Sequence, residues 1–158
     1  MTYHLTDEQW MVRNMVREFA RDVVAEKAAE RDQTKEFPRV IFKKMGELGF
    51  MGMMVPPEYG GEGTDTISYV LALSEIAYSC ASTAVVMSVH NSIACSSINH
   101  FGTDAQKKKY LPRMCSAKVI GAFALTEPHA GSNPVAQTTT AVRDGDEYII
   151  NGTKRFIT

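Results

Sequence analysis

The residue types best suited to chemistry in this sequence stand close together in residues 119–133. Thr126 and Ser132 each offer a hydroxyl that can donate or accept a hydrogen bond. Gly131 lies between them and has no Cβ, so a ligand can approach the backbone there. A polar, planar ligand with a nearby phosphate would suit such a corner. The exit of an ordinary strand into a turn would use the same residue types, and these residues alone do not decide between the two.

The apolar run 119–125 has to position this corner. It is short, uncharged and begins with β-branched residues, which predicts a buried strand, although periodicity alone does not exclude a helix. Pro128 cannot donate a hydrogen bond to a sheet, so we expect the strand to end before it.

Other segments that could hold a ligand have weaker support. Gly60 and Gly61 lie in the Pro- and Gly-rich residues 55–63, but no Lys-Ser/Thr pair follows them, so we predict a connecting loop and no P-loop. His90 falls in an uncharged helical segment, where a hydrogen-bonded core histidine is favoured over a metal ligand. We predict no metal site, because the cysteines match no zinc pattern and are expected to be reduced thiols. They are Cys80, Cys95 and Cys115.

The overall composition disfavours several classes of partner. The chain has 158 residues, of which 44% are apolar, enough for one domain or for one domain and part of a second. A net charge of -1 gives no field that would attract nucleic acid. No apolar run approaches the roughly 20 residues of a membrane-spanning helix. The N-terminus has no secretory pattern, so we expect a cytoplasmic protein, or one in the mitochondrial matrix if it is eukaryotic and already processed.

Helical periodicity dominates the first 118 residues. Thr6 and Gln9 form a capping box, and apolar residues at helical spacing then predict one long helix from about Thr6 toward Asp32. Pro38 is suited to the first turn of a second helix and Gly49 to its end.

Three more helices are expected after the loop. Thr64 or Asp65 caps the first, and its apolar residues lie nearly all round it, so we expect burial on more than one side. Residues 82–100 form an almost uncharged helix that either leaves room for an apolar ligand or packs closely against its neighbours. A second capping box at Thr103 starts a short basic helix, which we expect to close before Pro112.

The period changes after residue 118. Residues 137–142 and 147–150 read as two strands, and the Asp144-Gly145 step between them favours a tight turn. Asn151-Gly152 predicts a further turn, with residues 154–158 beginning the next strand.

The sequence therefore predicts a mainly α chain of two parts. Residues 1–118 form an N-terminal helical bundle, and residues 119–158 form the first strands of a β-barrel-like domain. We expect this second domain to be incomplete, because its last strand has barely begun.

Three motifs in this order resemble the acyl-CoA dehydrogenase family. They are VPPEYGGEG at residues 55–63, Gly102 with YLP at 110–112, and ALTEPHAGSN at 124–133. The last is similar to the family's flavin-binding signature, and NGTKRFIT at 151–158 falls where the family places its second flavin segment. The resemblance covers essentially the whole chain and implies a C-terminal helical domain that this sequence lacks.

The resemblance implies FAD as the cofactor and assigns roles to matching positions. Thr126 would bond the pyrimidine edge of the isoalloxazine, and Thr158 would bond near flavin N5. Ser132 would lie near the FAD pyrophosphate and the CoA portion of the substrate. Donors aimed at the ring stabilise its reduced form. The remaining implied cofactor-binding residues are Phe123, Leu125, Gly131, Phe156 and Ile157, and His90 is a further substrate-binding candidate.

Four positions depart from the family pattern. His129 stands where a small residue is usual, and Asn133 stands where aspartate is usual. We expect His129 to add bulk beside the pocket and Asn133 to remove a charge that braces the turn. Phe156 and Phe123 replace tryptophan and tyrosine, and an aromatic ring at 156 still stacks.

The resemblance also implies a reaction: oxidation of the α,β bond of an acyl-CoA to a trans-2-enoyl-CoA, with hydride transfer to flavin N5. In the family a glutamate of the C-terminal half removes the α proton. No catalytic base is therefore assigned here, and we expect these 158 residues alone to be inactive. The implied partners are an acyl-CoA, an electron-transfer flavoprotein and further copies of the chain in a homotetramer. Residues 88–92 favour short or branched acyl groups.

Two alternatives stay open at the level of the sequence. One is a flavin monooxygenase or nitroalkane oxidase on the same scaffold. The other is a non-catalytic helical binding module.

Overall fold

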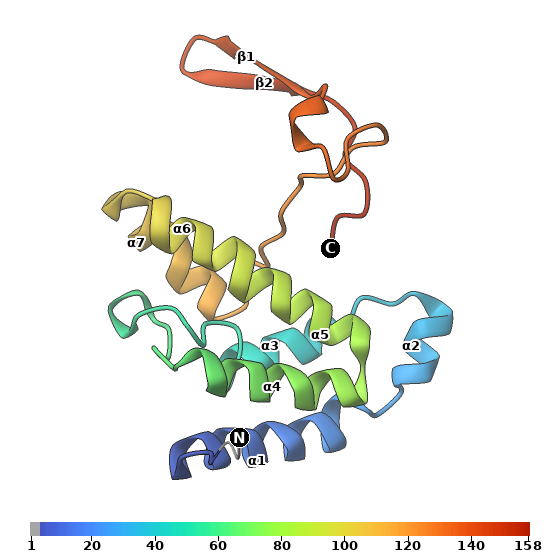
Figure 1. The fold of residues 1–158 in the computed structure, drawn as a ribbon, viewed down its shortest axis with the longest axis vertical. Coiled ribbons are helices and arrows are strands. Elements are labelled where there is room, and N and C mark those ends of the chain that lie inside the picture. The colour runs from blue at the N-terminus through green and yellow to red at the C-terminus, as the bar shows by residue number, and fades with distance from the viewer. Residues whose placement is uncertain (1–3) are drawn as a thin grey trace. The chain divides into compact units, whose positions relative to one another are not determined.

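The computed structural model describes residues 4–158, which divide into two compact units (Figure 1). The first unit ends at Gly121 and the second comprises Ala122–Thr158. The first is helical, and the second holds a two-stranded antiparallel sheet. The predicted fold class, mainly α followed by the first β strands, is confirmed. Within residues 4–158, no helix combines the length and apolarity that crossing a membrane requires.

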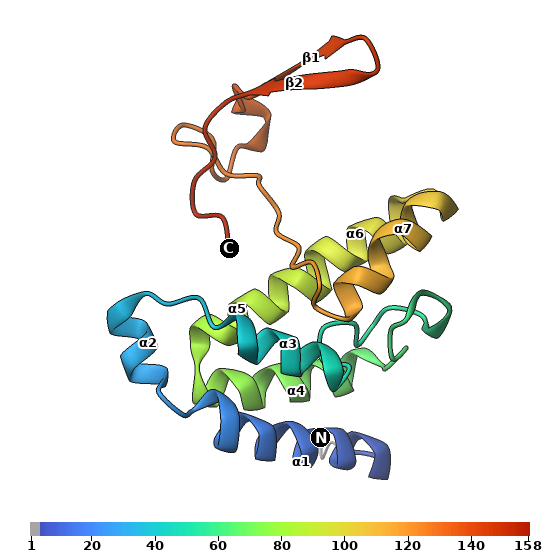
Figure 2. The ribbon, with the colours of Figure 1, turned by 180° about the vertical axis from the view of Figure 1, so that it is seen from behind.

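Most helices of the first unit follow one another with short connections, and a longer loop, residues 48–65, joins α3 to α4. In Figures 1 and 2, α1 lies beside α4 and α7 lies beside α6. The bounds are α1 (Asp7–Phe19) with a π-helical continuation (Ala20–Val24), α2 (Ala28–Thr34), α3 (Arg39–Glu47), a 3-10 turn (Pro57–Tyr59), α4 (Thr66–Ser79), α5 (Ala81–Ser88), a π-helical segment (Val89–Cys95), α6 (Ser96–Phe101) and α7 (Asp104–Cys115).

Side-chain caps set where α1, α4 and α7 begin, as the sequence predicts. The capping boxes at Thr6 and Thr103 are both present. Asp65 caps α4 by accepting from the N–H groups of Ile67 and Ser68. The Gln9 amide also donates to Asp65 at 3.3 Å, which ties the start of α1 to the start of α4.

The prediction of a single helix from Thr6 toward Asp32 is wrong, because the helix is interrupted at Lys27. The backbone of Lys27 is left-handed, with φ of 54°, and α2 begins after it. The Arg31 guanidinium donates to the carbonyl groups of Val24 and Glu26. These carbonyls would otherwise lack partners at a helix end, so Arg31 stabilises the break.

The expectation that α4 is buried on more than one side is also wrong. Ile67 and Val70 are 53% and 50% exposed, whereas Tyr69 and Ile76 are buried. Ser68 is buried as well, and its hydroxyl is satisfied there because it donates to Asp65 at 2.7 Å. One face of α4 therefore joins the core, and the other presents apolar side chains at the surface of this unit.

The predicted helix over residues 82–100 is confirmed as a continuous helix, with a π-helical segment in its middle. The buried amide of Asn91 lies on this π segment. Its Nδ2 donates to the carbonyls of Phe50 and Met87, and its Oδ1 accepts from the N–H of Met53 at 3.1 Å. Asn91 thus holds the loop that follows α3 against this helix.

The last helix continues past the point where the sequence suggests its end. α7 runs through Pro112 to Cys115, so the prediction that it closes before Pro112 is wrong. A proline inside a helix leaves the carbonyl four residues earlier without its usual donor. That residue is Lys108, which is exposed, so solvent can hydrate its carbonyl group. Burial of Leu111, Met114 and Cys115 on the other face favours continuation of the helix.

The second unit contains a hairpin of β1 (Thr140–Asp144) and β2 (Glu147–Asn151), preceded by a 3-10 turn (Pro134–Ala136). Asp144 pairs with Glu147 across a two-residue loop, and Gly145 has φ of 61°, which suits glycine in such a turn. The predicted strand over 137–142 thus begins three residues later and runs to Asp144.

Two predicted strands do not form. Residues 119–125 belong to no strand and none of them is buried, and residues 154–158 have no strand partner. A strand is stable only with a hydrogen-bonded neighbour, and among residues 4–158 β1 and β2 pair only with each other. The hairpin turn predicted at Asn151-Gly152 does not form either, because Asn151 ends β2 and Gly152 begins irregular backbone.

Candidate functional site

The corner after Leu125 is a closed turn. Glu127 and Ala130 exchange backbone hydrogen bonds of 2.9 Å and 3.2 Å around Pro128 and His129. The chain reverses within these four residues, which fixes the direction in which Gly131 and Ser132 continue. The turn begins after the predicted strand region 119–125, which itself forms no strand.

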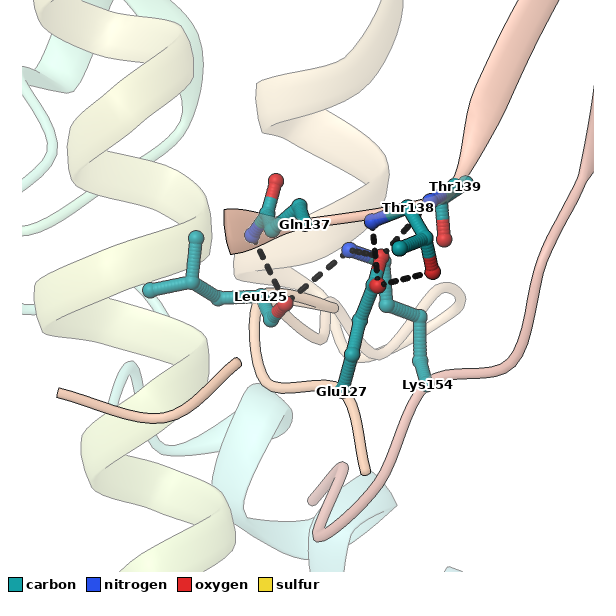
Figure 3. A network of polar contacts seen from close by, with 6 residues as sticks. All are labelled: Leu125, Glu127, Gln137, Thr138, Thr139 and Lys154. Carbon is teal, nitrogen blue, oxygen red and sulfur yellow. Dashed lines mark hydrogen bonds and ion pairs between the residues drawn. The ribbon is translucent and has the colours of Figure 1, made fainter. Parts of the chain in front are cut away.

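The carboxylate of Glu127 is the centre of a buried polar network, drawn in Figure 3. Its Oε2 accepts from the N–H and the hydroxyl of Thr138 at 2.6 Å and 2.9 Å. Its Oε1 accepts from the N–H of Thr139 and from the Lys154 ammonium, both at 3.0 Å. These donors, the Thr138 N–H above all, hold the pKa of Glu127 well below its usual range, so the group is an anion.

Lys154 joins the second segment of the candidate site to the corner. Its ammonium donates to Glu127 and, at 2.9 Å, to the carbonyl of Leu125 (Figure 3). The Gln137 amide donates to that same carbonyl at 2.8 Å. The N–H of Arg155 donates to the carbonyl of Thr126, also at 2.8 Å. Residues 125–127 are therefore each bonded to Lys154 or Arg155.

The structure thus brings together two of the predicted flavin segments within the second unit. Thr158 lies three residues beyond Arg155, and three residues of chain span at most about 10 Å. Because the N–H of Arg155 donates to the carbonyl of Thr126, the end of the second segment lies near Thr126 in space, although the two are far apart in the sequence. Convergence of the side chains of Thr126, Ser132 and Thr158 on one ligand stays a prediction.

The predicted cofactor-binding side chains are largely accessible in this unit. Phe156 is 87% exposed, and Phe123, Leu125 and Ile157 are exposed as well. Thr126 is half-buried, and Ser132 and Thr158 are exposed. Their hydroxyls make no hydrogen bond within residues 4–158, so they are available to a ligand. A Cβ added at Gly131 would meet no atom within 4 Å, which leaves open space beside the corner.

His90, the other predicted substrate residue, is fully buried in the first unit. Its Nδ1 accepts from the N–H of Gly121 at 2.9 Å, so Nε2 carries the proton and lies 3.5 Å from the Cys95 sulfur. Burial lowers the pKa of His90 from its usual value. The prediction of a hydrogen-bonded core histidine is confirmed, and contact with a substrate stays a prediction.

The two departures in the corner have separate surroundings. His129 is exposed in the turn. Asn133 precedes the 3-10 turn and accepts a backbone bond from Ala136, but its side chain forms no cap there. The bracing in this region comes from Glu127 instead.

Sequence reasoning missed the roles of Glu127, Lys154, Gln137 and Thr138. Glu127 and Lys154 stand inside the two motifs, yet they are 27 positions apart and their pairing leaves no periodic signal. The available hint was that Glu127 is the single carboxylate of the two motifs, while the second motif carries the cations Lys154 and Arg155 and no acid.

Comparison with known proteins supports the division seen in the fold. Residues 6–118 match the description "Acyl-CoA dehydrogenase, N-terminal domain", and residues 122–158 match "Acyl-CoA dehydrogenase, middle domain".

Individual relatives cover the whole chain. The short-chain specific acyl-CoA dehydrogenase of Clostridium acetobutylicum is 49% identical over 158 residues, which are 100% of this chain and 42% of that protein. The chain therefore spans about two fifths of the length of this relative.

Solved structures have the same fold. A chain in the structure of the electron transferring flavoprotein of Acidaminococcus fermentans superimposes with a TM-score of 0.94 at 44% identity, covering 99% of this chain and 41% of that one. Butyryl-CoA dehydrogenase from Megasphaera elsdenii gives a TM-score of 0.90 at 35% identity, covering 99% and 42%. From the two domain matches and these similarities, the chain belongs to the acyl-CoA dehydrogenase family.

Proposed function

We propose that this chain supplies part of the flavin and substrate site of an FAD-dependent acyl-CoA dehydrogenase. The enzyme would oxidise the α,β bond of an acyl-CoA thioester to a trans-2-enoyl-CoA, with hydride transfer to flavin N5. The single observation that carries the proposal is the bonding of residues 125–127 to Lys154 and Arg155. It joins the two segments in which the family's flavin residues lie.

The residues present fit a flavin. An isoalloxazine has two apolar faces and polar edges, and this unit offers exposed apolar side chains together with hydroxyls that have no partner within residues 4–158. Leu125 and Phe156 would contact the ring, and Thr126 and Thr158 would bond its edges. Open space at Gly131 allows backbone to approach the pyrophosphate, with Ser132 beside it. Phe123 and Ile157 complete the proposed contacts.

The substrate proposal is a short-chain acyl-CoA. It is supported by two relatives, one named short-chain specific and the other a butyryl-CoA dehydrogenase. His90 and Ser132 are the residues of this chain proposed on the substrate side. The proposed base is a glutamate outside residues 1–158. The family resemblance places this base in the C-terminal half, so none of the glutamates within residues 1–158 is proposed for the role.

The proposed electron acceptor is an electron-transfer flavoprotein. It is supported by the similarity to a chain in a structure of that protein. We also propose a homotetramer, on the family resemblance alone. The mass of the purified protein in solution, measured by light scattering, tests the second of these proposals.

Product analysis tests the function. The polypeptide is purified as its gene encodes it, and the flavin released from a sample is identified. Butyryl-CoA is then incubated with the protein and an electron-accepting dye that reoxidises the flavin. We expect FAD and a trans-2-enoyl-CoA product. A protein without flavin would contradict the proposal. So would a protein for which no saturated acyl-CoA leads to reduction of the dye. Oxygen consumption with a non-thioester substrate would favour a monooxygenase or nitroalkane oxidase instead.

A further inference from the structure

A buried ion pair in the second unit is not among the groups proposed to contact the flavin or the substrate. The side chain of Glu127 is 2% exposed and that of Lys154 is 22% exposed, with 3.0 Å between carboxylate and ammonium. Neither group faces open solvent as a typical surface pair does, and all of the partners of the carboxylate lie in residues 138–154.

We propose that Glu127 and Lys154 are positioning residues for the flavin, which set the orientation of the Thr126 hydroxyl relative to the segment that ends at Thr158. This inference rests on the proposed function. Neither residue needs to touch the flavin, because both act through the backbone of residues 125–127.

Hydrogen bonds on either side of Thr126 fix its backbone. The carbonyl of Leu125 accepts from Lys154, and the side chain of Glu127 accepts from the same ammonium. The carbonyl of Thr126 itself accepts from the N–H of Arg155. With both neighbours and its own carbonyl fixed, the peptide planes flanking Thr126 have little freedom, while its hydroxyl is left without a partner in the second unit.

The bonds of Lys154 also set the register of the two segments. One ammonium bridges two acceptors that are two residues apart, so a shift of Lys154 by one residue would break both bonds. The carboxylate in turn is anchored by the N–H groups of Thr138 and Thr139, which immediately precede β1. The pair therefore connects the corner, the start of the hairpin and the segment after it.

The ion pair also stabilises the corner energetically. Charged hydrogen bonds are stronger than neutral ones, and they define a single geometry. If Lys154 is removed, Glu127 keeps its backbone donors but its buried charge has no cation, so the corner has reason to rearrange. Hydride transfer is sensitive to such movement, since a misplacement of about 1 Å can reduce a rate by about 100-fold.

Three variants test the proposal in the flavin-loaded protein: Lys154→Met, Glu127→Gln and the double variant. Lys108→Met, which removes an exposed lysine from α7, is the matched control. The measurements are the FAD dissociation constant, the visible spectrum of the bound flavin and its midpoint potential, with unfolding followed in parallel.

We expect each single variant to raise the FAD dissociation constant by at least about tenfold and to shift the bound flavin's spectrum and potential. The double variant should be less impaired than the sum of the two, because the residues act as one pair. Lys154→Arg, which keeps the charge, should recover part of the affinity. Lys108→Met should leave all three quantities unchanged.

Two results would overturn the proposal. One is a loss of folding stability in Lys154→Met with unchanged FAD affinity, spectrum and potential, which would make the pair merely structural. The other is strict additivity of the two single variants. If Lys154→Met does not fold, Glu127→Gln is used alone, since it removes one charge of the pair and keeps the shape of the side chain. Unchanged FAD affinity, flavin spectrum and potential in that variant would also contradict the proposal. Wild-type protein without any flavin would instead refute the proposed function itself.

Discussion

The Nδ1 atom of His90 accepts a hydrogen bond of 2.9 Å from the backbone N–H of Gly121, 31 residues later in the chain. This bond fastens the end of the first unit to the π-helical segment, in the core beside Ala94 and Met114. It also fixes the neutral tautomer of the ring, since a protonated imidazole has no acceptor to offer.

Folding stability should therefore depend on pH through His90. Burial lowers the pKa of His90 below its ordinary value of 6.5, so the unfolded chain binds the proton more readily than the folded one. The stabilisation is complete above that value and is lost as the pH falls below it, by up to about 1.4 kcal/mol per pH unit. Urea unfolding between pH 7.5 and 5 measures this slope. His90→Leu should reduce the slope. An unchanged slope in His90→Leu would exclude His90 as its source.

Asn91 should be among the polar residues that contribute most to stability. Truncation to alanine leaves the buried N–H of Met53 and the carbonyl of Phe50 without their partner. We expect a loss of at least about 2 kcal/mol in the free energy of unfolding. Ser92→Ala, at an exposed neighbouring position, should cost less than about 0.5 kcal/mol. Equal effects of the two substitutions in denaturant titrations would contradict this account.

Glu127 should remain ionised in moderately acid solution. The N–H of Thr138 and the other donors lower its pKa below the ordinary 4.5, so its contribution to stability is complete above that value and is lost only as the pH falls further. Carbon-13 NMR of the labelled carboxylate checks this directly. A titration midpoint at or above 4.5 would show that the network is not formed in solution.

Gly131 and Gly152 should respond differently to substitution by alanine. A Cβ at Gly152 would lie 2.1 Å from the Thr139 hydroxyl oxygen and 2.8 Å from the Thr139 Cα, so Gly152→Ala should destabilise the second unit by about 1–3 kcal/mol. A Cβ at Gly131 meets nothing, so Gly131→Ala should leave unfolding unchanged and weaken FAD binding if the pyrophosphate approaches there. Normal FAD affinity in Gly131→Ala would remove this glycine from the proposed site.

The sequence predicted best what local chemistry determines. Thr6, Asp65 and Thr103 cap helices because their oxygens reach N–H groups two or three residues away. It failed where a distant partner decides the outcome. Arg31 stabilises a helix break that periodicity does not indicate, and residues 119–125 stay unpaired because a strand requires a neighbour.

The candidate site divides in the same way. Thr126, Gly131 and Ser132 could be singled out from one short motif by residue type. The pair of Glu127 and Lys154 could not, because the two groups meet only through the fold.

The most direct measurement is an anaerobic titration of the purified gene product with butyryl-CoA, followed by visible absorbance. The account predicts a yellow protein whose flavin band is bleached in proportion to added substrate, as two electrons leave the α,β bond. A protein that carries no flavin, or whose flavin is bleached by dithionite but by no acyl-CoA, would contradict it.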